Sequence, residues 1–167
     1  MLLIHTGNGK GKTTASIGVA IRALGQNMRV GFGQFMKRDN QAGEQHILKQ
    51  LLNENFHAFG LGFFTREEDR KLHTEAARNL LDWALSRMED FDLLVLDEAL
   101  YALGYGLISQ EELQAVIGKA ASANTHLVLS GRGLPEWLRE QADTVTEMTE
   151  IQHAYQKGRP ATPGIEY

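Results

Sequence analysis

Short apolar runs alternate along this chain with longer stretches in which apolar residues recur every three or four positions. An apolar run of about 4–8 residues is typical of a buried strand, and the longer periodicity is typical of an amphipathic helix. The pattern predicts strands over residues 2–5, 29–35, 56–59, 93–96, 126–130 and 144–148. It predicts helices over residues 13–25 and 44–52, from 65 to 88 and from 109 to 120, with a short helix near Pro135.

Two of the predicted helices begin with a capping signal. Thr65 with Glu68, and Ser109 with Glu112, place a hydroxyl three residues before a glutamate, which is the spacing of a capping box. Beyond the first of these signals, apolar residues recur at every fourth position, at Leu72, Ala76, Leu80, Ala84 and Met88. We expect these residues to form the buried stripe of a long helix.

The regular alternation of strand and helix determines the fold class. Apolar strands separated by helices indicate an α/β fold, with a mostly parallel sheet and helices on both faces. No repeat, low-complexity tract or linker divides residues 1–167, so a single domain is expected. The last stretch, about 156–167, contains Gly158, Pro160, Pro163 and Gly164 and is expected to be an irregular tail.

A glycine-rich turn follows the first predicted strand and leads into the first helix. Residues 6–14 read Thr-Gly-Asn-Gly-Lys-Gly-Lys-Thr-Thr. This order of strand, turn and helix is the context of a phosphate-binding P-loop, in which backbone N–H groups and the helix N-terminus surround an anion. Thr6 stands where the usual pattern has its first glycine. A turn that merely caps a helix is the alternative, and the composition of the nine residues favours nucleoside triphosphate binding. The fold expected is therefore P-loop NTPase-like (RecA-like).

Every residue of this loop is a candidate for nucleotide binding: Thr6, Gly7, Asn8, Gly9, Lys10, Gly11, Lys12, Thr13 and Thr14. We expect glycine at positions 7, 9 and 11 because side chains there would prevent the backbone from wrapping around phosphate. Lys12 can reach the terminal phosphates, and Thr13 can offer its hydroxyl to Mg²⁺ or Mn²⁺.

Acidic and basic side chains follow other predicted strands. Asp97 and Glu98 end the apolar run 93–96 and resemble a Walker B segment, whose carboxylate holds Mg²⁺ directly or through water. The alternative is that one of these acids caps the next helix. Arg132 follows strand 126–130 and can clamp phosphate oxygens, although a surface arginine in a turn is the plainer interpretation. Lys37 and Arg38 are weaker candidates of the same kind.

Composition narrows the class of protein. The chain has 167 residues, is 43% hydrophobic and carries a net charge of -4. The mildly acidic balance argues against a nucleic-acid partner. The absence of cysteine excludes disulfides, a thiol nucleophile and a cysteine metal site. No apolar stretch is long enough to cross a bilayer, so we expect a cytoplasmic enzyme without a membrane partner.

The P-loop with threonine at its first position resembles that of the ATP:corrinoid adenosyltransferases, the family that makes the cobalt–carbon bond of coenzyme B12. Further blocks similar to that family follow in the same order at residues 34–37, 43–44, 96–98, 130–133, 142–148 and 164–167. The resemblance covers essentially the whole chain. Longer members carry an N-terminal segment that helps to cover the active site, whereas this chain begins at the first strand. Where members have Gly-Phe-Thr-Trp, this chain has Gly62-Phe63-Phe64-Thr65.

The resemblance implies transfer of the 5′-deoxyadenosyl group of ATP to the Co(I) centre of a corrinoid, with release of triphosphate. Co(I) is a strong nucleophile, so no protein base is required. Lys12 and Arg132 are then the catalytic candidates, because they can stabilise the leaving triphosphate. Thr13, Asp97 and Glu98 are the metal candidates. The implied setting is coenzyme B12 biosynthesis or salvage, with a homodimer and a flavoprotein-type reductase as partners.

The resemblance also assigns an expectation to the aromatic pair Phe63 and Phe64. Aromatic residues near this position are associated in the family with the lower face of the corrin, where an apolar pocket displaces the axial ligand and eases reduction of Co(II). Ordinary packing beneath the loop is the alternative for both residues. Two other functions remain open, a P-loop kinase or NTPase that acts by phosphoryl transfer on a small molecule, and a nucleotide-sensing module without turnover.

Overall fold

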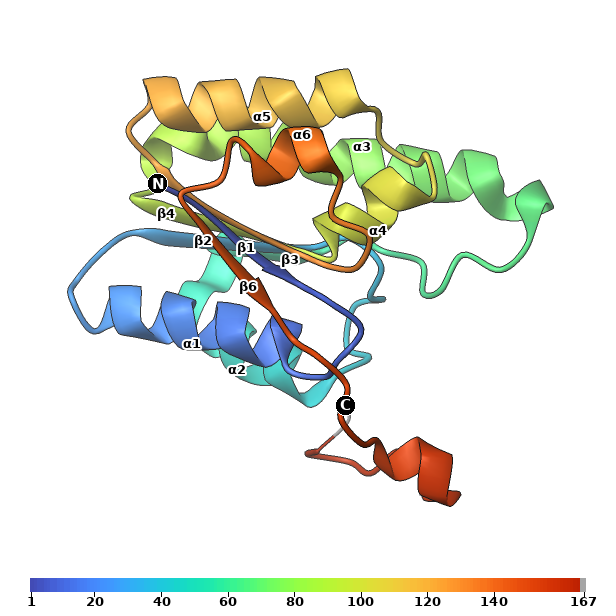
Figure 1. Ribbon diagram of the computed structural model, residues 1–167. Coiled ribbons are helices and arrows are strands. Elements are labelled where there is room, and N and C mark those ends of the chain that lie inside the picture. The colour runs from blue at the N-terminus through green and yellow to red at the C-terminus, as the bar shows by residue number, and fades with distance from the viewer. Residues whose placement is uncertain (166–167) are drawn as a thin grey trace.

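The computed structural model describes residues 1–165, and its centre is a parallel sheet (Figure 1). The six strands are β1 (Leu2–Thr6), β2 (Val30–Gln34), β3 (Phe56–Ala58), β4 (Leu93–Asp97), β5 (His126–Ser130) and β6 (Thr144–Glu147). They lie in the order β3-β2-β4-β5-β1-β6, and every neighbouring pair is parallel. The predicted α/β class with a mostly parallel sheet is therefore confirmed. Strand β5 separates β1, which leads into the P-loop, from β4, which carries the acids.

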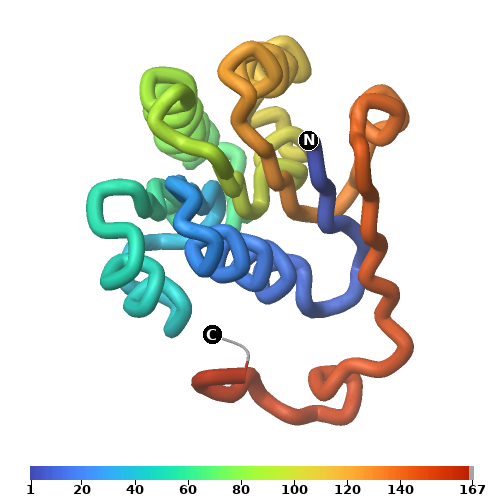
Figure 2. The backbone as a smooth tube through the Cα atoms, turned by 90° about the vertical axis from the view of Figure 1, so that its left-hand side faces the viewer, coloured from blue at the N-terminus to red at the C-terminus, as the bar shows by residue number. Residues whose placement is uncertain are grey.

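Helices cover both faces of this sheet, as Figures 1 and 2 show. One face carries α1 (Lys12–Leu24) and α2 (Gly43–Leu52). The other carries α3 (Arg70–Arg87), α4 (Ala99–Gly104), α5 (Gln110–Ser122) and α6 (Glu136–Arg139). Short 3₁₀ turns occupy Asn53–Asn55, Glu67–Asp69, Met88–Asp90 and Ala154–Lys157. Helix α4 has no counterpart in the sequence prediction.

The central strands are apolar throughout because both of their faces are buried. In β4, Leu94 and Leu96 pack in the core beneath α3 and α5, whereas Leu93 and Val95 pack in the core beneath α1 and α2. Successive side chains of a strand point to opposite faces, so a strand covered on both sides needs apolar residues at every position. This pattern made β4 and β5 easy to recognise in the sequence.

The predicted start of the long helix is wrong. Helix α3 begins at Arg70, after a 3₁₀ turn, and Arg66 is still extended. The carboxylate of Glu68 pairs with Arg66 at 2.9 Å, so it does not reach back to Thr65 as a capping box requires. The second predicted capping box, at the start of α5, is confirmed. There the Ser109 hydroxyl accepts from the N–H of Glu112 at 3.1 Å, and the Glu112 carboxylate accepts from the N–H of Ser109 at 2.7 Å.

The predicted buried stripe of α3 is correct only in its C-terminal half. Leu80, Ala84 and Met88 are buried, but Leu72 is 56% exposed. A helix has 3.6 residues per turn, so each step of four residues overshoots a full turn by about 40°. Over two such steps the stripe drifts off the buried face, and at that end His73 and Ala77 are the buried residues.

The chain after β6 forms an arm that leaves the body and turns beneath α1 (Figure 2). Apart from its 3₁₀ turn, Ala154–Lys157, this arm is irregular up to residue 165, as the sequence predicted. Glu166 and Tyr167, which belong to the last family block, lie outside the described residues. Within residues 1–165, no helix has the length and apolar character needed to cross a membrane.

Candidate active site

A cavity of about 770 Å³ lies where the strands of the sheet end. Its walls include seven consecutive residues of the predicted P-loop: Asn8, Gly9, Lys10, Gly11, Lys12, Thr13 and Thr14. Glu98 follows β4 and Arg132 follows β5, and both also line the cavity. The strand ends therefore bring residues that are far apart in the sequence to one edge of the sheet, which is where ligands bind in open parallel sheets. Thr6 and Gly7, the first two residues of the predicted P-loop, do not line the cavity.

Glycine at positions 7 and 9 has a packing role that the sequence did not reveal. A Cβ on Gly7 would lie 2.4 Å from the carbonyl oxygen of Met148, and a Cβ on Gly9 would lie 2.8 Å from the same atom. The N–H of Gly9 donates to that oxygen at 2.7 Å. Glycine at these two positions therefore has a second role beside the one expected at phosphate, because both residues let the chain after β6 pack on the loop. Gly11 has a φ of 111°, in the left-handed region that favours glycine.

Lys12 folds back over its own loop. Its ammonium donates to the carbonyl oxygens of Gly7 at 2.7 Å and Gly9 at 2.6 Å. Burial lowers the pKa of Lys12, and the nearby charge of Arg132 lowers it further. The same ammonium borders the cavity, so it can exchange carbonyl partners for the oxygens of a bound phosphate.

Lys10 connects the loop with the C-terminal arm. Its ammonium donates to the carbonyl oxygen of Ile165 at 2.5 Å. Gly164 and Ile165 line the cavity, together with His153. The arm therefore contributes to the lining of the cavity, together with residues of α1 and α2.

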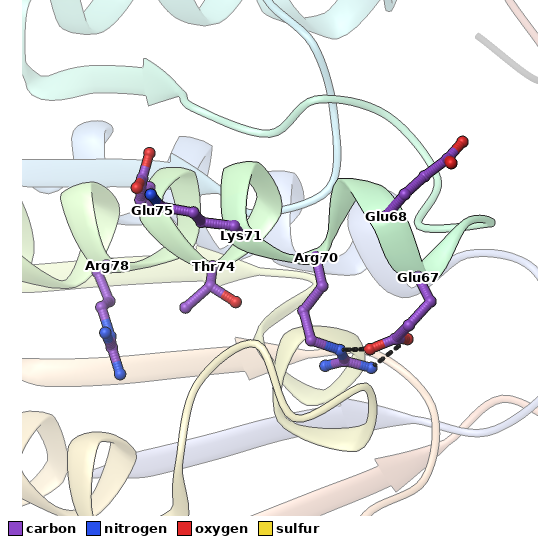
Figure 3. A pocket seen from close by; sticks show the side chains of 7 residues that line it. All are labelled: Glu67, Glu68, Arg70, Lys71, Thr74, Glu75 and Arg78. Carbon is purple, nitrogen blue, oxygen red and sulfur yellow. Dashed lines mark hydrogen bonds and ion pairs between the residues drawn. The ribbon is translucent and has the colours of Figure 1, made fainter.

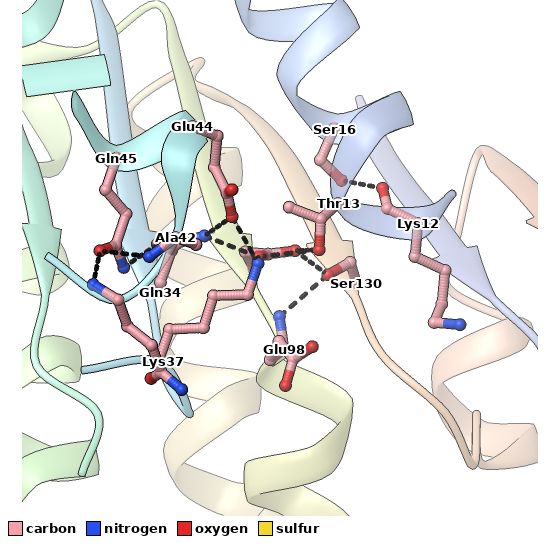
Figure 4. A network of polar contacts seen from close by, with 12 residues as sticks. Lys12, Thr13, Ser16, Gln34, Lys37, Ala42, Glu44, Gln45, Glu98 and Ser130 are labelled. Carbon is pink, nitrogen blue, oxygen red and sulfur yellow. Dashed lines mark hydrogen bonds and ion pairs between the residues drawn. The ribbon is translucent and has the colours of Figure 1, made fainter. Parts of the chain in front are cut away.

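Asp97 is completely buried and surrounded by hydrogen-bond donors. Figure 4 shows three of the side chains that contact it, Thr13, Gln34 and Ser130. Its carboxylate accepts from the hydroxyl of Ser130 at 2.5 Å and from the side-chain amide of Gln34 at 3.1 Å. The hydroxyl of Thr13 lies 3.1 Å from both carboxylate oxygens. The ammonium of Lys37 lies 3.7 Å away. Asp97 thus holds Thr13 from behind and does not itself line the cavity.

Glu98 differs from Asp97 in its burial and in its position relative to the cavity. It lines the cavity, and its backbone has a φ of 65°, which is uncommon for a residue with a side chain. The hydroxyl of Ser130 accepts from its N–H at 2.9 Å. Burial and the neighbouring charge of Asp97 raise the pKa of Glu98 to about 7. Glu98 occupies the N-cap position of α4, but its side chain makes no capping hydrogen bond, which argues against the capping interpretation.

Basic residues complete the polar wall. The guanidinium of Arg132 lies 5.9 Å from the ring of Tyr101, and both side chains line the cavity. The ammonium of Lys37 pairs with Glu44 at 2.6 Å. Burial alone would lower the pKa of Lys37, but the charges of Asp97 and Glu44 outweigh it and raise that pKa. Arg38 is directed elsewhere, because its Nε donates to the carbonyl oxygen of Leu61 at 2.5 Å.

The structure separates the two phenylalanines of the loop after β3. Phe63 is 79% exposed and lines the cavity. Phe64 is half-buried and packs edge-on against the rings of His73 at 5.3 Å and Tyr105 at 5.7 Å. The guanidinium of Arg70 lies 4.8 Å from its ring. Only Phe63 therefore faces the space where a ligand can bind, and Phe64 has the contacts of a packed side chain.

The amino-acid sequence is similar to known proteins along its whole length. The model of the family described as ATP:corrinoid adenosyltransferase BtuR/CobO/CobP matches residues 1–167. The chain belongs to this family. It is 38% identical over 170 residues to a corrinoid adenosyltransferase of Pseudomonas aeruginosa, a match that covers 100% of this chain and 83% of the relative. It is 34% identical to the corrinoid adenosyltransferase of Escherichia coli strain K12 and 33% identical to corrinoid adenosyltransferase CobA of Salmonella typhimurium, covering 100% of this chain and 85% of each relative.

Membership of the adenosyltransferase family confirms the resemblance drawn from the sequence. Except for the block at residues 142–148, each block that carried it contributes lining residues to one cavity. These blocks follow four different strands, β1, β2, β4 and β5, or lie at the start of α2 and on the C-terminal arm. The family does not favour the alternative of a phosphoryl-transfer kinase or NTPase.

The oxygen donors of this adenosyltransferase fit a hard divalent cation. The Thr13 hydroxyl and the carboxylate of Glu98 line the cavity, and Asp97 lies directly behind Thr13. Among the described residues, no group of three or more His, Cys, Asp or Glu side chains is placed to hold a metal ion. Mg²⁺ usually takes only one or two protein oxygens and completes its shell with water and substrate phosphates, so this donor set suits it.

Sequence reasoning assigned no site role to several residues that lie at the site, although three of them, Gln34, Glu44 and Ser130, fall in blocks that resemble the family. Gln34 and Ser130 are the last residues of β2 and β5, and both contact Asp97. Tyr101 lies on the unpredicted helix α4, and Glu44 lies on α2. The rule that ligands bind at strand ends would have singled out Gln34 and Ser130, because both are polar residues that end an apolar strand.

A second hollow, of about 500 Å³, lies on the outer surface near the start of α3 (Figure 3). Charged and polar side chains line it: Glu67, Glu68, Arg70, Lys71, Thr74, Glu75 and Arg78. Arg70 pairs there with Glu67. The hollow shares no lining residue with the active-site cavity, and exposed ion pairs of this kind are common on protein surfaces.

Proposed function

We propose that this protein transfers the 5′-deoxyadenosyl group of ATP to the Co(I) centre of a corrinoid, releasing triphosphate, in coenzyme B12 biosynthesis or salvage. Family membership over the whole chain supports this activity. The observation that carries it is the composition of the cavity, in which a phosphate-binding loop faces an exposed aromatic side chain, Phe63. A kinase needs the first of these features, whereas a corrin surface also calls for the second.

The reaction is a displacement at carbon. The Co(I) electron pair attacks C5′ of ATP, the bond between C5′ and the α-phosphate oxygen breaks, and its electrons leave with triphosphate. No proton has to be removed for this step, so it requires no protein base. The task left to the protein is to hold C5′ near cobalt and to stabilise the leaving group.

We assign the triphosphate to the P-loop residues 6–14, with Lys12 and Arg132 as the catalytic residues. Both side chains border the same cavity and carry positive charge toward it. Lys10 also borders the cavity, but it donates to Ile165, so we infer that it orders the C-terminal arm as well as contributing charge. Such charges act on the leaving oxygen as negative charge develops there.

Thr13, Asp97 and Glu98 would hold Mg²⁺ or Mn²⁺, and we infer different roles for the two acids. The carboxylate of Asp97 already accepts from three neighbouring side chains, so it suits an indirect role through Thr13. Glu98 faces the cavity and suits direct contact or contact through water. When bound, the cation neutralises part of the charge on the triphosphate.

We propose that Phe63, rather than Phe64, lies against the corrin. Its ring is exposed at the cavity and cannot coordinate cobalt, so it can exclude the axial ligand without replacing it. Phe64 then keeps the loop in place through its contacts with His73 and Tyr105.

The remaining aspects of function rest on the chemistry of the reaction. Without a cysteine the chain has no thiol to reduce Co(II), so we infer an external reductase of the flavoprotein type. We also propose that the chain works in the cytoplasm, where ATP and such a reductase occur together, and acts as one P-loop domain. Exposed apolar residues on α1 and α2, Ile21 and Leu51, offer a surface for the homodimer that we propose.

Absorption spectroscopy of cob(I)alamin mixed with the protein, ATP and Mg²⁺ tests the proposed activity. We expect the spectrum of an alkylated corrinoid to develop, with triphosphate as the other product. Release of ADP or orthophosphate without a change in the corrinoid spectrum would instead indicate phosphoryl transfer.

A further inference from the structure

We propose that Gln45 is a positioning residue that holds two parts of the active site at once, the carboxylate of Asp97 and the loop that carries Phe63. The inference deepens the proposed function and rests on it. Gln45 lies in the first turn of α2, does not line the cavity and is completely buried. A buried carboxamide needs partners for its oxygen and for both of its amide hydrogens, and the partners of Gln45 lead toward both parts of the site.

The orientation of the Gln45 carboxamide is determined by the backbone. Its Oε1 accepts from the N–H of Gln41 at 2.8 Å and from the N–H of Ala42 at 3.3 Å. Backbone N–H groups can only donate, so the oxygen of Gln45 must face them. The nitrogen, Nε2, is therefore directed to the opposite side, toward Gln34 (Figure 4).

The orientation of the Gln45 carboxamide determines that of the Gln34 carboxamide, which contacts Asp97. Gln45 Nε2 donates to Gln34 Oε1 at 2.8 Å, so the oxygen of Gln34 is directed toward α2. Gln34 Nε2 then faces the other way and donates to Asp97 Oδ2 at 3.1 Å. If the Gln34 amide were reversed, its oxygen would lie against a carboxylate oxygen, and two acceptors would repel one another. Gln34 Nε2 also lies 3.4 Å from a carboxylate oxygen of Glu44, which favours the same orientation. Gln45 supplies the donor that anchors the opposite end of this amide and so holds Gln34 against Asp97.

A second branch leads from Gln45 to the aromatic loop. Gln45 Nε2 also donates to the carbonyl oxygen of Arg38 at 3.0 Å, and Arg38 Nε donates to the carbonyl oxygen of Leu61 at 2.5 Å. The loop is packed closely on the segment after β2, since a Cβ on Gly60 would lie 2.1 Å from the carbonyl oxygen of Phe35. Gln45 thus fixes the segment on which the loop bearing Phe63 rests.

Burial makes this network sensitive to change. Gln34 and Gln45 are both completely buried, so water does not replace a lost partner without rearrangement. A methionine at position 45 keeps the length of the side chain but leaves Gln34 Oε1 without the donor that Gln45 supplies. The Arg38 carbonyl would keep only its longer bond, at 3.3 Å, from the N–H of Gln41. The carboxylate of Asp97 and the loop that carries Phe63 should then both be held less rigidly.

Four variants of the whole chain separate the two branches. Gln45→Met removes both branches, Gln34→Met removes only the one to Asp97, and Arg38→Met removes only the one to the loop. Gln50→Met is the matched control, because Gln50 is an exposed residue of the same helix. ATP affinity is measured by calorimetry with and without Mg²⁺, and amide hydrogen exchange is measured over residues 60–64. Neither measurement needs a corrinoid, so failure of adenosyl transfer would not be mistaken for failure of this inference.

We expect Gln45→Met and Gln34→Met to weaken the Mg²⁺-dependent gain in ATP affinity about tenfold, as is typical when a partner of a metal-site group is removed. We expect Gln45→Met and Arg38→Met to speed exchange in residues 60–64. The inference is overturned if Gln45→Met matches Gln50→Met in both measurements. If Gln45→Met does not fold, the other two variants decide: each must change its own end and leave the other end as in wild type, and any other result overturns the inference.

Discussion

The hydroxyl of Ser130 lies 2.5 Å from a carboxylate oxygen of Asp97. The same hydroxyl accepts from the N–H of Glu98 at 2.9 Å, so one side chain at the end of β5 holds both acids at the end of β4. Its single hydrogen is donated to the carboxylate, and its lone pair receives the backbone N–H. Ser130 thereby supports the left-handed backbone of Glu98, which directs that side chain toward the cavity.

Replacing Ser130 with alanine should therefore weaken activity without removing either of the two acids from the site. We expect the Ser130→Ala variant to lose about 10–100-fold in kcat/KM, with an increased requirement for Mg²⁺, since groups that orient metal ligands have effects of this size. Steady-state kinetics over a range of Mg²⁺ concentrations measures both. Ser122→Ala is the control, because the Ser122 hydroxyl is exposed and donates to the carbonyl oxygen of Gly118 within the same helix. A Ser130→Ala variant with the kinetics of this control would contradict the positioning role.

The raised pKa of Glu98 predicts how stability changes with pH. Burial and the charge of Asp97 raise this pKa from 4.5 to about 7. The folded state therefore binds the proton more tightly than the unfolded state, and stability is lost as the pH rises from about 4.5 to 7. A Glu98→Gln variant stays neutral, so without ATP and Mg²⁺ its melting temperature should exceed that of wild type at pH 8. At pH 4.5 the difference should be small; an equal difference at both pH values would mean that Glu98 is not the cause.

Lys12 should matter for turnover and little for folding. We expect Lys12→Ala to lower kcat about 100–1,000-fold, the usual effect of removing one group that stabilises developing negative charge. The melting temperature should remain close to that of wild type, because the hydrogen bonds of this ammonium to residues 1–165 go to carbonyl oxygens of its own loop. Lys119→Ala, which removes an exposed lysine paired with Glu89, serves as the control for loss of charge. Near-normal adenosylation by the Lys12 variant would refute the assignment.

Much of the fold could be predicted because local signals decide it. The apolar runs of β4 and β5 and the capping box of Ser109 are local, and each was correct. Helix α4 was missed because it has only six residues and follows Glu98, whose backbone is left-handed. No local sequence signal predicts a left-handed residue at that position. The candidate site residues of the P-loop and of the end of β4 could be proposed from spacing, and most of them line the cavity. The contacts of Gln45 and Met148 could not be foreseen, because they join segments that are far apart in the sequence or that no local pattern pairs.

Gly9 illustrates such a contact and allows a test. A Cβ at this position would meet the backbone of Met148 at 2.8 Å, and no side-chain rotation can relieve a clash with backbone atoms. We expect Gly9→Ala to lower the free energy of unfolding by about 1–3 kcal/mol, the range for inserting a methyl group into a packed region. Urea unfolding measures this change in the absence of nucleotide.

The matched control for this substitution is Gly118→Ala. Apart from its chain neighbours and the backbone of its own helix, no described atom lies within 4 Å of a Cβ at Gly118, which belongs to α5. Alanine favours a helix over glycine by about 0.5–1 kcal/mol, so this variant should be more stable than wild type. If Gly9→Ala also left stability unchanged or raised it, the close packing of the chain after β6 on the loop would not exist in solution.

The two phenylalanines of the loop should separate into a functional residue and a packing residue. Phe63→Ala removes a ring that is 79% exposed, so the melting temperature should hardly change. Adenosylation should fall when the assay starts from Co(II), because reduction depends on exclusion of the axial ligand, and should fall less when Co(I) is generated beforehand. Phe64→Ala removes ring contacts with His73 and Tyr105, which are worth about 0.5–1.5 kcal/mol each beyond area burial. It should lower the melting temperature and slow both assays equally.

Comparing the two assays for each variant makes the test independent of overall activity. The ratio of the rate from Co(II) to the rate from preformed Co(I) cancels losses that come from ATP binding or from a smaller folded fraction. We expect this ratio to fall in Phe63→Ala and to stay at the wild-type value in Phe64→Ala, since only Phe63 lines the cavity. Phe63→Leu keeps an apolar side chain that cannot coordinate cobalt, so it should restore part of the ratio. An unchanged ratio in Phe63→Ala would place the groups that exclude the axial ligand elsewhere in the cavity, and a reduced ratio in Phe64→Ala would show that loop packing alone controls reduction.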